Sequence, residues 1–308
     1  MKKNYTNYQK KKVIKMSENQ DKGLHKSVIN WYPGHMAKTK REIKEKINLI
    51  DIIYEVCDAR IPFSSRINDI DDIVREKPHI LIMSKYDLCD QKETDKFIEY
   101  YESKGFFVLK KNLLNDSLED IFTLSRKILK EKIASQHLKG INKTTIRALV
   151  IGIPNAGKST LINKLVGKKI AKTGNKPGVT KSLSWIRVRK DIELLDTPGV
   201  LWPKLDQEKQ AYQLAATTAI KEEILDNQEI ALYILTFLEK YYPELLKKYY
   251  DLETTEDYDY IIQTIGKKWN LFKKGGLIDE NRVLDLVIND VKQGKLKGVT
   301  FDRSDLIE

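Results

Sequence analysis

The chain has 308 residues, of which 55 are lysine or arginine and 44 are aspartate or glutamate, for a formal net charge of +11. An apolar fraction of 41% and a charged fraction of 32% are typical of a folded globular protein, and no apolar run approaches the roughly 18 residues that cross a bilayer. These values exclude a disordered chain and favour an anionic partner and no membrane partner. The presence of only two cysteines makes a reduced cytosolic compartment the expectation, and the absence of arginine before Arg41 disfavours an organellar presequence.

The N-terminal region is strongly basic. Its first 50 residues contain 13 basic and 4 acidic side chains, and residues 1–26 show no apolar periodicity. We predict that residues 1–26 form a disordered basic tail, because such a segment has too little apolar surface to fold. Ile43, Ile47 and Ile50 recur at helical spacing, which predicts a helix before the first strand.

Short apolar runs then alternate with helical patterns. Six runs predict strands, at residues 52–56, 80–83, 106–109, 147–152, 184–188 and 192–196. Helical patterns lie at residues 91–104, 161–166 and 282–292, and strand patterns nearly vanish beyond Pro203. The alternation predicts an α/β domain over residues 27–205, with a mainly parallel sheet covered by helices on both faces. Residues 206–308 are predicted to form an all-helical domain.

A phosphate-binding loop is the strongest motif. Gly152-Ile-Pro-Asn-Ala-Gly-Lys-Ser159 fits the pattern G-x-x-x-x-G-K-[ST] between a predicted strand and a predicted helix. Backbone N–H groups of such a loop cradle phosphate oxygens at the positive end of the helix. Lys158 is expected to reach the β- and γ-phosphates, and the hydroxyl of Ser159 to bind Mg²⁺. The competing interpretation is a glycine turn without a ligand.

Two further segments suit a γ-phosphate and its metal ion. Asp196-Thr-Pro-Gly199 follows the last predicted strand, where Asp196 can hold Mg²⁺ through water and the N–H of Gly199 can meet the γ-phosphate. Thr180 lies on a glycine- and lysine-rich loop between the two motifs and is suited to closing over the metal and the γ-phosphate. Ordinary turns are the alternative for both segments.

A base-reading candidate comes earlier in the chain. Ser84-Lys-Tyr-Asp87 follows the strand at 80–83, and GTPases use the pattern Asn-Lys-x-Asp to select guanine. The Asp87 carboxylate would accept two N–H bonds from guanine while the stem of Lys85 lies under the base. Ser84 replaces the expected Asn, which puts in doubt one hydrogen bond to the base and a tie to the phosphate loop.

The order of these motifs is unusual, because the base-reading candidate precedes the phosphate loop. Both follow strands, and open α/β sheets bind ligands at the carboxyl ends of their strands, so a circular permutation preserves the site. This order resembles the circularly permuted GTPases, and within them a group that acts in ribosome biogenesis. Trp31-Tyr-Pro-Gly-His-Met-Ala-Lys38 and Asp58-Ala-Arg-Ile-Pro-Phe-Ser-Ser-Arg66 support the resemblance, which covers about residues 27–308.

The resemblance implies a circularly permuted P-loop GTPase domain followed by helices that contact rRNA. It implies binding to the large ribosomal subunit precursor late in assembly, hydrolysis of GTP to GDP and phosphate that the subunit stimulates, and no DNA partner. Lys85 and Asp87 match the residues that contact guanine in this family. Thr180 matches the first switch segment, and Asp196 and Gly199 match the second switch segment. The nucleotide contacts of the phosphate loop are matched by Pro154, Asn155, Ala156, Gly157, Lys158, Ser159 and Thr160.

The same resemblance assigns the metal ligands and the catalytic group. Ser159, Thr180 and Asp196 correspond to the Mg²⁺ site, with Lys158 and Thr180 also serving catalysis. Asn155 matches a residue that helps to coordinate K⁺ in potassium-activated relatives. Val200 stands where many GTPases carry a water-orienting Gln, and the family assigns a catalytic role to the histidine that is His35 here.

Several candidates keep two interpretations. Asp58 and Arg60 either position the N-terminal segment or form an ion pair in a strand-end turn. A basic cluster in the predicted helical domain either meets RNA or is a solvated helix end, and it comprises Lys267, Lys268, Lys273 and Lys274 beside Trp269 and Phe272. The other histidines are predicted to be structural or surface residues, and a fifth GTPase motif after Leu109 is too degenerate to assign.

At the level of function, two alternatives to an assembly GTPase stay open. One is a nucleotide-dependent RNA-binding module with little hydrolysis, which the missing Gln and Ser84 motivate. The other is an ATPase, which competition between ATP and GTP would reveal. Ten basic and no acidic side chains between residues 151 and 190 favour a phosphate-bearing partner in each case.

Overall fold

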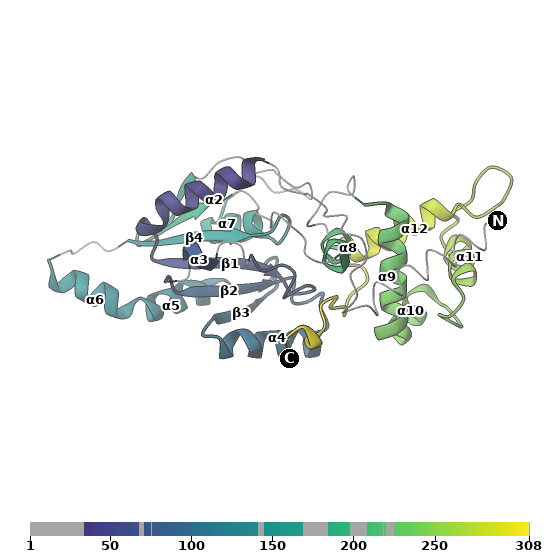
Figure 1. Cartoon of the computed structure of the whole chain (residues 1–308), viewed down its shortest axis with the longest axis horizontal. Helices are drawn as coiled ribbons and strands as arrows, with labels where there is room; N and C mark the ends of the chain where they lie inside the picture. The colour runs from purple at the N-terminus through teal and green to yellow at the C-terminus, as the bar shows by residue number, and fades with distance from the viewer. Residues whose placement is uncertain are drawn as a thin grey trace.

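A six-stranded sheet with helices beside a separate group of helices makes up the described part of the chain (Figure 1). The computed structural model describes residues 34–67, 71–74, 76–140, 145–168, 184–197, 208–217, 219 and 225–307. None of the helices in these ranges is both long and apolar enough to cross a membrane. The predicted basic tail, residues 1–26, lies outside them.

The sheet is mainly parallel, as the sequence predicts. Its spatial order is β3-β2-β1-β4-β6-β5, and only β5 runs antiparallel to its neighbour. In chain order the strands are β1 (Ile52–Asp58), β2 (His79–Ser84), β3 (Phe107–Lys111), β4 (Ile146–Gly152), β5 (Ser184–Arg189) and β6 (Ile192–Asp196). Every residue of β1 and of β2 is buried, because these inner strands are covered on both faces.

Helices connect the parallel strands. Those of the α/β part are α2 (Gly34–Lys46), α3 (Asp71–Val74), α4 (Gln91–Ser103), α5 (Glu119–Ile128), α6 (Lys130–Leu138) and α7 (Lys158–Val166), with a 3₁₀ turn η1 at Ile47–Leu49. Local sequence sets where some of them begin. The Asp90 side chain accepts from the backbone N–H groups of Lys92 and Glu93, so α4 starts at a carboxylate cap.

The second group of helices begins after β6. It comprises α8 (Glu208–Ala216), α9 (Asn227–Tyr241), α10 (Pro243–Tyr250), α11 (Tyr258–Lys268) and α12 (Glu280–Lys292). Helix α9 is apolar on nearly all sides because α8, α10 and α12 pack around it (Figure 1). No strand occurs in the described residues beyond β6, so the prediction of a helical C-terminal region is confirmed.

The end of the chain returns to the sheet. After α12, the backbone N–H of Gly298 donates to Leu88 O (2.8 Å), and the N–H of Phe301 donates to Arg60 O (2.7 Å). The N–H of Ser304, at the start of the 3₁₀ turn η4 (Ser304–Leu306), donates to Glu93 Oε1 on α4. Residues 298–304 therefore connect the helical part, through backbone hydrogen bonds, to the loops that follow β1 and β2 and to α4. The domain limits at 205 and 206 stay a prediction.

Candidate nucleotide-binding site

The phosphate loop joins β4 to α7 in the geometry that its glycines allow. Asn155 and Gly157 both have positive φ angles, of 59° and 110°. A Cβ atom at Gly157 would lie 2.8 Å from Leu113 Cδ1, and one at Gly152 would lie 2.5 Å from Val56 O. Glycine is required at both positions because the loop is close to neighbouring backbone and side chains.

Lys158, the first residue of α7, lies buried inside this loop. Its Nζ donates to Gly152 O and to Ile153 O, each at 2.9 Å. Burial lowers the pKa of Lys158 to about 8, and the Asp196 carboxylate partly opposes the shift. Among the described residues, the hydrogen-bond partners of the ammonium group are thus two carbonyls, and a phosphate group would give it a stronger, charged partner.

Asp196 ends β6 at the same edge of the sheet. Its side chain is 3% exposed, and among the described residues its Oδ1 has no hydrogen-bond partner. Burial raises the pKa of Asp196 to about 6, and Lys158 partly opposes the shift. A buried carboxylate oxygen without a donor fits the hydration shell of a Mg²⁺ ion, which prefers oxygen ligands and keeps several waters. The next residue, Thr197, donates its hydroxyl to Val150 O (2.7 Å) and fixes the strand end.

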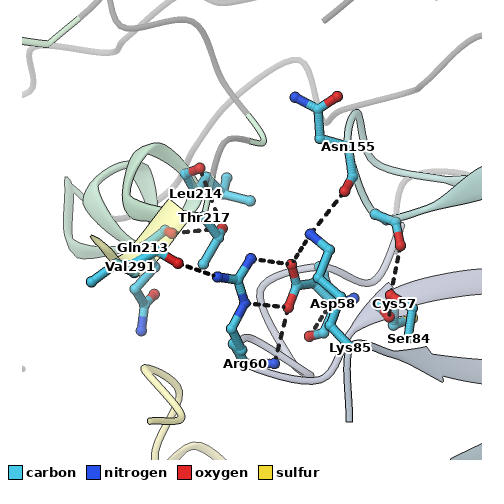
Figure 2. A network of polar contacts seen from close by, with 12 residues as sticks. Cys57, Asp58, Arg60, Ser84, Lys85, Asn155, Gln213, Leu214, Thr217 and Val291 are labelled. Carbon is cyan, nitrogen blue, oxygen red and sulfur yellow. Dashed lines mark hydrogen bonds and ion pairs between the residues drawn. The ribbon is translucent and has the colours of Figure 1, made fainter. Parts of the chain in front are cut away.

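The base-reading candidate follows β2 and lies against the phosphate loop. Lys85 has a φ of 56°, and its Nζ donates to Asp58 Oδ2 (2.7 Å) and to Asn155 O (2.9 Å), as Figure 2 shows. Burial lowers the pKa of Lys85, and the Asp58 carboxylate partly opposes this shift. Asp87 is exposed, and no hydrogen bond or ion pair to another described residue is found for its carboxylate. Its oxygens are therefore open to a ligand.

Ser84 still connects the base-reading loop to the phosphate loop, although it replaces the Asn that usually makes this contact. The side chain is completely buried, with Oγ 2.6 Å from Ala156 O in the phosphate loop and 2.8 Å from Cys57 O in β1 (Figure 2). The single hydroxyl proton is shared between these two carbonyls. The base-reading loop and the phosphate loop are thus joined by a side chain shorter than the expected amide.

Replacing Ser84 by Ala is expected to destabilise the free protein by about 1–3 kcal/mol, because two buried carbonyls lose their donor. The same change should weaken guanine nucleotide binding, since the two loops are no longer tied. Urea unfolding monitored by circular dichroism, together with a nucleotide titration, tests this expectation. Ser84→Asn is the matched comparison. Unfolding curves of Ser84→Ala that overlay those of the unchanged protein would contradict it.

The structure adds one residue that sequence patterns did not assign, and it gives the contacts of two that they had singled out. Leu113, which follows β3, packs against Gly157, so the loop after β3 borders the nucleotide site where a fifth GTPase motif is expected. Asp58 and Arg60 form a buried ion pair (2.8 Å), in line with the strand-end interpretation. Leu113 carries no signature beyond being apolar after a strand, whereas Asp58 and Arg60 lie in a motif that the sequence analysis already singled out.

The remaining site residues are only partly described. Ser159 and Thr160 lie in the first turn of α7, beside Lys158. His35 lies in α2, and its side chain is outside the described atoms. Thr180, Gly199 and Val200 fall outside the described residues. The structure therefore brings together the predicted residues of the phosphate loop, the base-reading loop and Asp196, and their joint role in binding stays a prediction.

Comparison with known proteins agrees with this geometry. A family model described as "50S ribosome-binding GTPase" matches residues 147–267. The chain is 46% identical over 278 residues to ribosome biogenesis GTPase A of Bacillus licheniformis, covering 90% of this chain and 98% of the relative. It is 32% identical over 275 residues to the protein of that name from Thermotoga maritima, covering 89% and 94% of the two chains.

A solved structure extends the comparison to the fold. GNP-bound YlqF from T. maritima matches with 29% sequence identity and a TM-score of 0.59, over 86% of this chain and 98% of that one. The expectation of a P-loop GTPase domain with a helical C-terminal region is thereby confirmed. Because the similarity runs through nearly the whole length of these relatives, the chain belongs to the ribosome biogenesis GTPase A family.

Proposed function

We propose that this protein is a cytoplasmic GTPase that binds the precursor of the large ribosomal subunit late in its assembly and hydrolyses GTP to GDP and phosphate there. The observation that carries the proposal is the junction of base-reading loop and phosphate loop through Ser84 and Lys85. Family membership makes the chain a GTPase of ribosome assembly. The large subunit is favoured by the description of the matching family model.

We propose a separate role in nucleotide binding for each of the site residues. Asp87 accepts the N–H groups of guanine, Lys85 supports the base, and Lys158 with the backbone of the phosphate loop neutralises the β- and γ-phosphates. Ser159, Thr180 and Asp196 are the residues that would hold Mg²⁺, which would add to the neutralisation of phosphate charge. We also propose Asn155 as a ligand for K⁺.

RNA contact is proposed for a basic surface formed by the last turn of α11 and the turn between α11 and α12. Phe272 and Leu277 are exposed there, by 40% and 73%, among the lysines 267, 268, 273 and 274. Trp269 instead packs edge-on against Tyr250 with ring centroids 5.7 Å apart, so it belongs to the helical core. Since the region from residue 204 carries 15 basic and 20 acidic side chains, the contact must be local.

Subunit binding is expected to depend strongly on salt and to favour GTP. Lysines that meet rRNA phosphates release counterions, so affinity should fall by about 10³-fold or more between 50 and 200 mM salt if six or more phosphates are contacted. Co-sedimentation with large ribosomal subunits, in GDP and in a non-hydrolysable GTP analogue, measures both effects. Binding that is equal in the two nucleotides, or flat with salt, would refute the proposal.

A nucleotide-dependent RNA-binding module with little hydrolysis is the alternative function. Val200 favours it, because an apolar side chain beside Gly199 cannot orient the attacking water. Multiple-turnover GTP hydrolysis, measured with and without large subunits, separates the two functions. A module that only binds gains nothing from the subunit, whereas a GTPase that the subunit activates turns over faster.

We propose that His35 supplies the missing water-orienting group when the subunit closes the site. Replacing His35 by Ala is then expected to leave GTP affinity nearly unchanged and to lower subunit-stimulated kcat by about 10²–10⁴-fold, the usual contribution of positioned acid–base groups. Parallel measurement of GTP affinity and stimulated kcat tests it. Normal turnover of the variant on the subunit would remove His35 from the catalytic residues.

A further inference from the structure

The loop that follows β1 connects the base-reading loop with the helical part of the molecule. Figure 2 shows Asp58, the last residue of β1, and Arg60, in the loop, between Lys85 on one side and the C-terminal end of α12 on the other. The motif Asp58 to Arg66 stands out in the sequence, yet the proposed hydrolysis of GTP gives it no part. Its contacts indicate one.

The Asp58 carboxylate is saturated with donors. It is 2% exposed, and its Oδ1 accepts from the backbone N–H and the Nε of Arg60, at 3.1 and 3.0 Å. Its Oδ2 accepts from Arg60 Nη2 (2.8 Å) and from Lys85 Nζ (2.7 Å). Burial opposes ionisation, but Arg60 and Lys85 outweigh it and hold the pKa of Asp58 well below its usual range. A carboxylate offers about four lone-pair sites, so none is left for water.

Arg60 carries this contact into the helical part. Its guanidinium is 2% exposed, and Nη1 donates to Val291 O (2.8 Å) in the last turn of α12. A cation is favourable at this end of a helix, where carbonyl dipoles point outward. The backbone carbonyl of Arg60 also accepts from the N–H of Phe301, in the returning C-terminal segment. One residue therefore holds both α12 and the end of the chain.

We propose that Asp58 is a positioning residue for the guanine contact and that the Asp58–Arg60 pair links nucleotide binding energetically to the docking of α12. The proposal rests on the proposed guanine site, through Lys85. A nucleotide that fixes Lys85 also fixes Asp58, because a buried carboxylate cannot exchange its partners for water. Arg60 then has less freedom to leave Val291. By linkage, a docked α12 must strengthen nucleotide binding by the same factor.

An ion pair that served stability alone would not need this arrangement. Buried charges cost desolvation energy, and packed apolar side chains often replace such pairs without loss of stability. Here two cationic side chains, those of Arg60 and Lys85, share one carboxylate, and Arg60 joins segments that are more than 200 positions apart in the sequence through its bond to Val291. The arrangement connects the two parts of the molecule at the point where Lys85 supports the base.

Three full-length variants separate linkage from simple packing. Asp58→Asn removes the shared charge, and Arg60→Lys keeps the charge but lacks the planar fork that spans Asp58 and Val291. Ser64→Ala is the control, because Ser64 lies in the same loop and bonds Asp302 and Gln213 without contacting Lys85. Each protein is titrated with fluorescent GDP, and amide hydrogen exchange of the last turn of α12 is measured with and without GDP.

In the unchanged protein, GDP is expected to slow exchange in that turn about fivefold or more, the lower end of ordinary coupling between sites. Arg60→Lys should lose this protection and bind GDP about fivefold more weakly, while Ser64→Ala keeps both. Asp58→Asn should weaken GDP binding further, and if it does not fold, Arg60→Lys decides. Protection that persists in Arg60→Lys, or that Ser64→Ala loses equally, overturns the linkage. GDP binding by the unchanged protein with no response in α12 overturns the linkage alone, whereas absence of GDP binding overturns the proposed function itself.

Discussion

Replacing Asp87 by Asn is expected to change the preferred base from guanine to xanthine. The carboxylate accepts two N–H groups of guanine, and an amide offers one acceptor and an N–H₂ group that meets the guanine amino group unfavourably. Hydrogen bonds to charged groups contribute about 1.5–3 kcal/mol each, so affinity for GDP should fall about 10²-fold or more. Xanthine carries a carbonyl in place of that amino group and can accept from the amide.

The measurement is competition for a fluorescent GDP by GDP, XDP and ADP, for the unchanged protein and for Asp87→Asn. Since Asp87 is exposed and has no partner among the described residues, the substitution should leave the stability of the fold unchanged, and a thermal melt serves as the control. Equal competition by ADP and GDP in the unchanged protein would show that the site does not select guanine. XDP binding that does not improve in the variant would remove Asp87 from the base contacts.

Replacing Lys158 by Ala is expected to lower GTP and GDP affinity by about 10²–10³-fold, from the loss of two charge-assisted bonds to phosphate. The free protein should remain folded, because the partners of Lys158 within the described ranges are two carbonyls of its own loop, and burial already disfavours its charge. Isothermal titration with nucleotide and Mg²⁺ measures the affinity. His35→Ala, which should bind normally, is the matched comparison. A Lys158→Ala protein with unaltered affinity would show that the phosphates bind elsewhere.

Much of this fold follows from short-range patterns. The predicted strand at residues 192–196 coincides with β6, and the phosphate loop lies between β4 and α7 as its sequence requires. The strand predicted at 106–109 is shifted by the structure to Phe107–Lys111. Phe106 instead packs under the guanidinium of Arg66, whose Cζ lies 4.6 Å from the centroid of the Phe106 ring. This residue therefore takes part in a tertiary contact and not in the strand.

The connections between distant segments were beyond the sequence patterns. Asp58 and Arg60 allow an ion pair to be inferred locally, but nothing in the sequence identifies Val291 as the partner of Arg60. Similarly, Ser84 departs from the expected Asn, and only the distance to Ala156 O shows that the hydroxyl replaces the amide. The first contact depends on how α12 lies against the loop after β1, and the second on how β1, β2 and β4 lie beside one another, neither of which a single sequence specifies.

The position of β1 has a consequence for synthesis of the protein. Among the described strands it is the first to be made, yet it pairs on one side with β2 and on the other with β4, where Ile52 lies opposite Ala148. A growing chain can form the β1–β2 pair early, but the other edge of β1 stays unpaired until β4 has been translated. Until then the backbone N–H and C=O groups along that edge have no partner strand, and the side chains of β1 are apolar for the most part, so the nascent chain exposes an aggregation-prone strand for most of the translation of this sheet. The permuted motif order thus leaves the folded site unchanged, but it delays the pairing of β1 with β4 during synthesis.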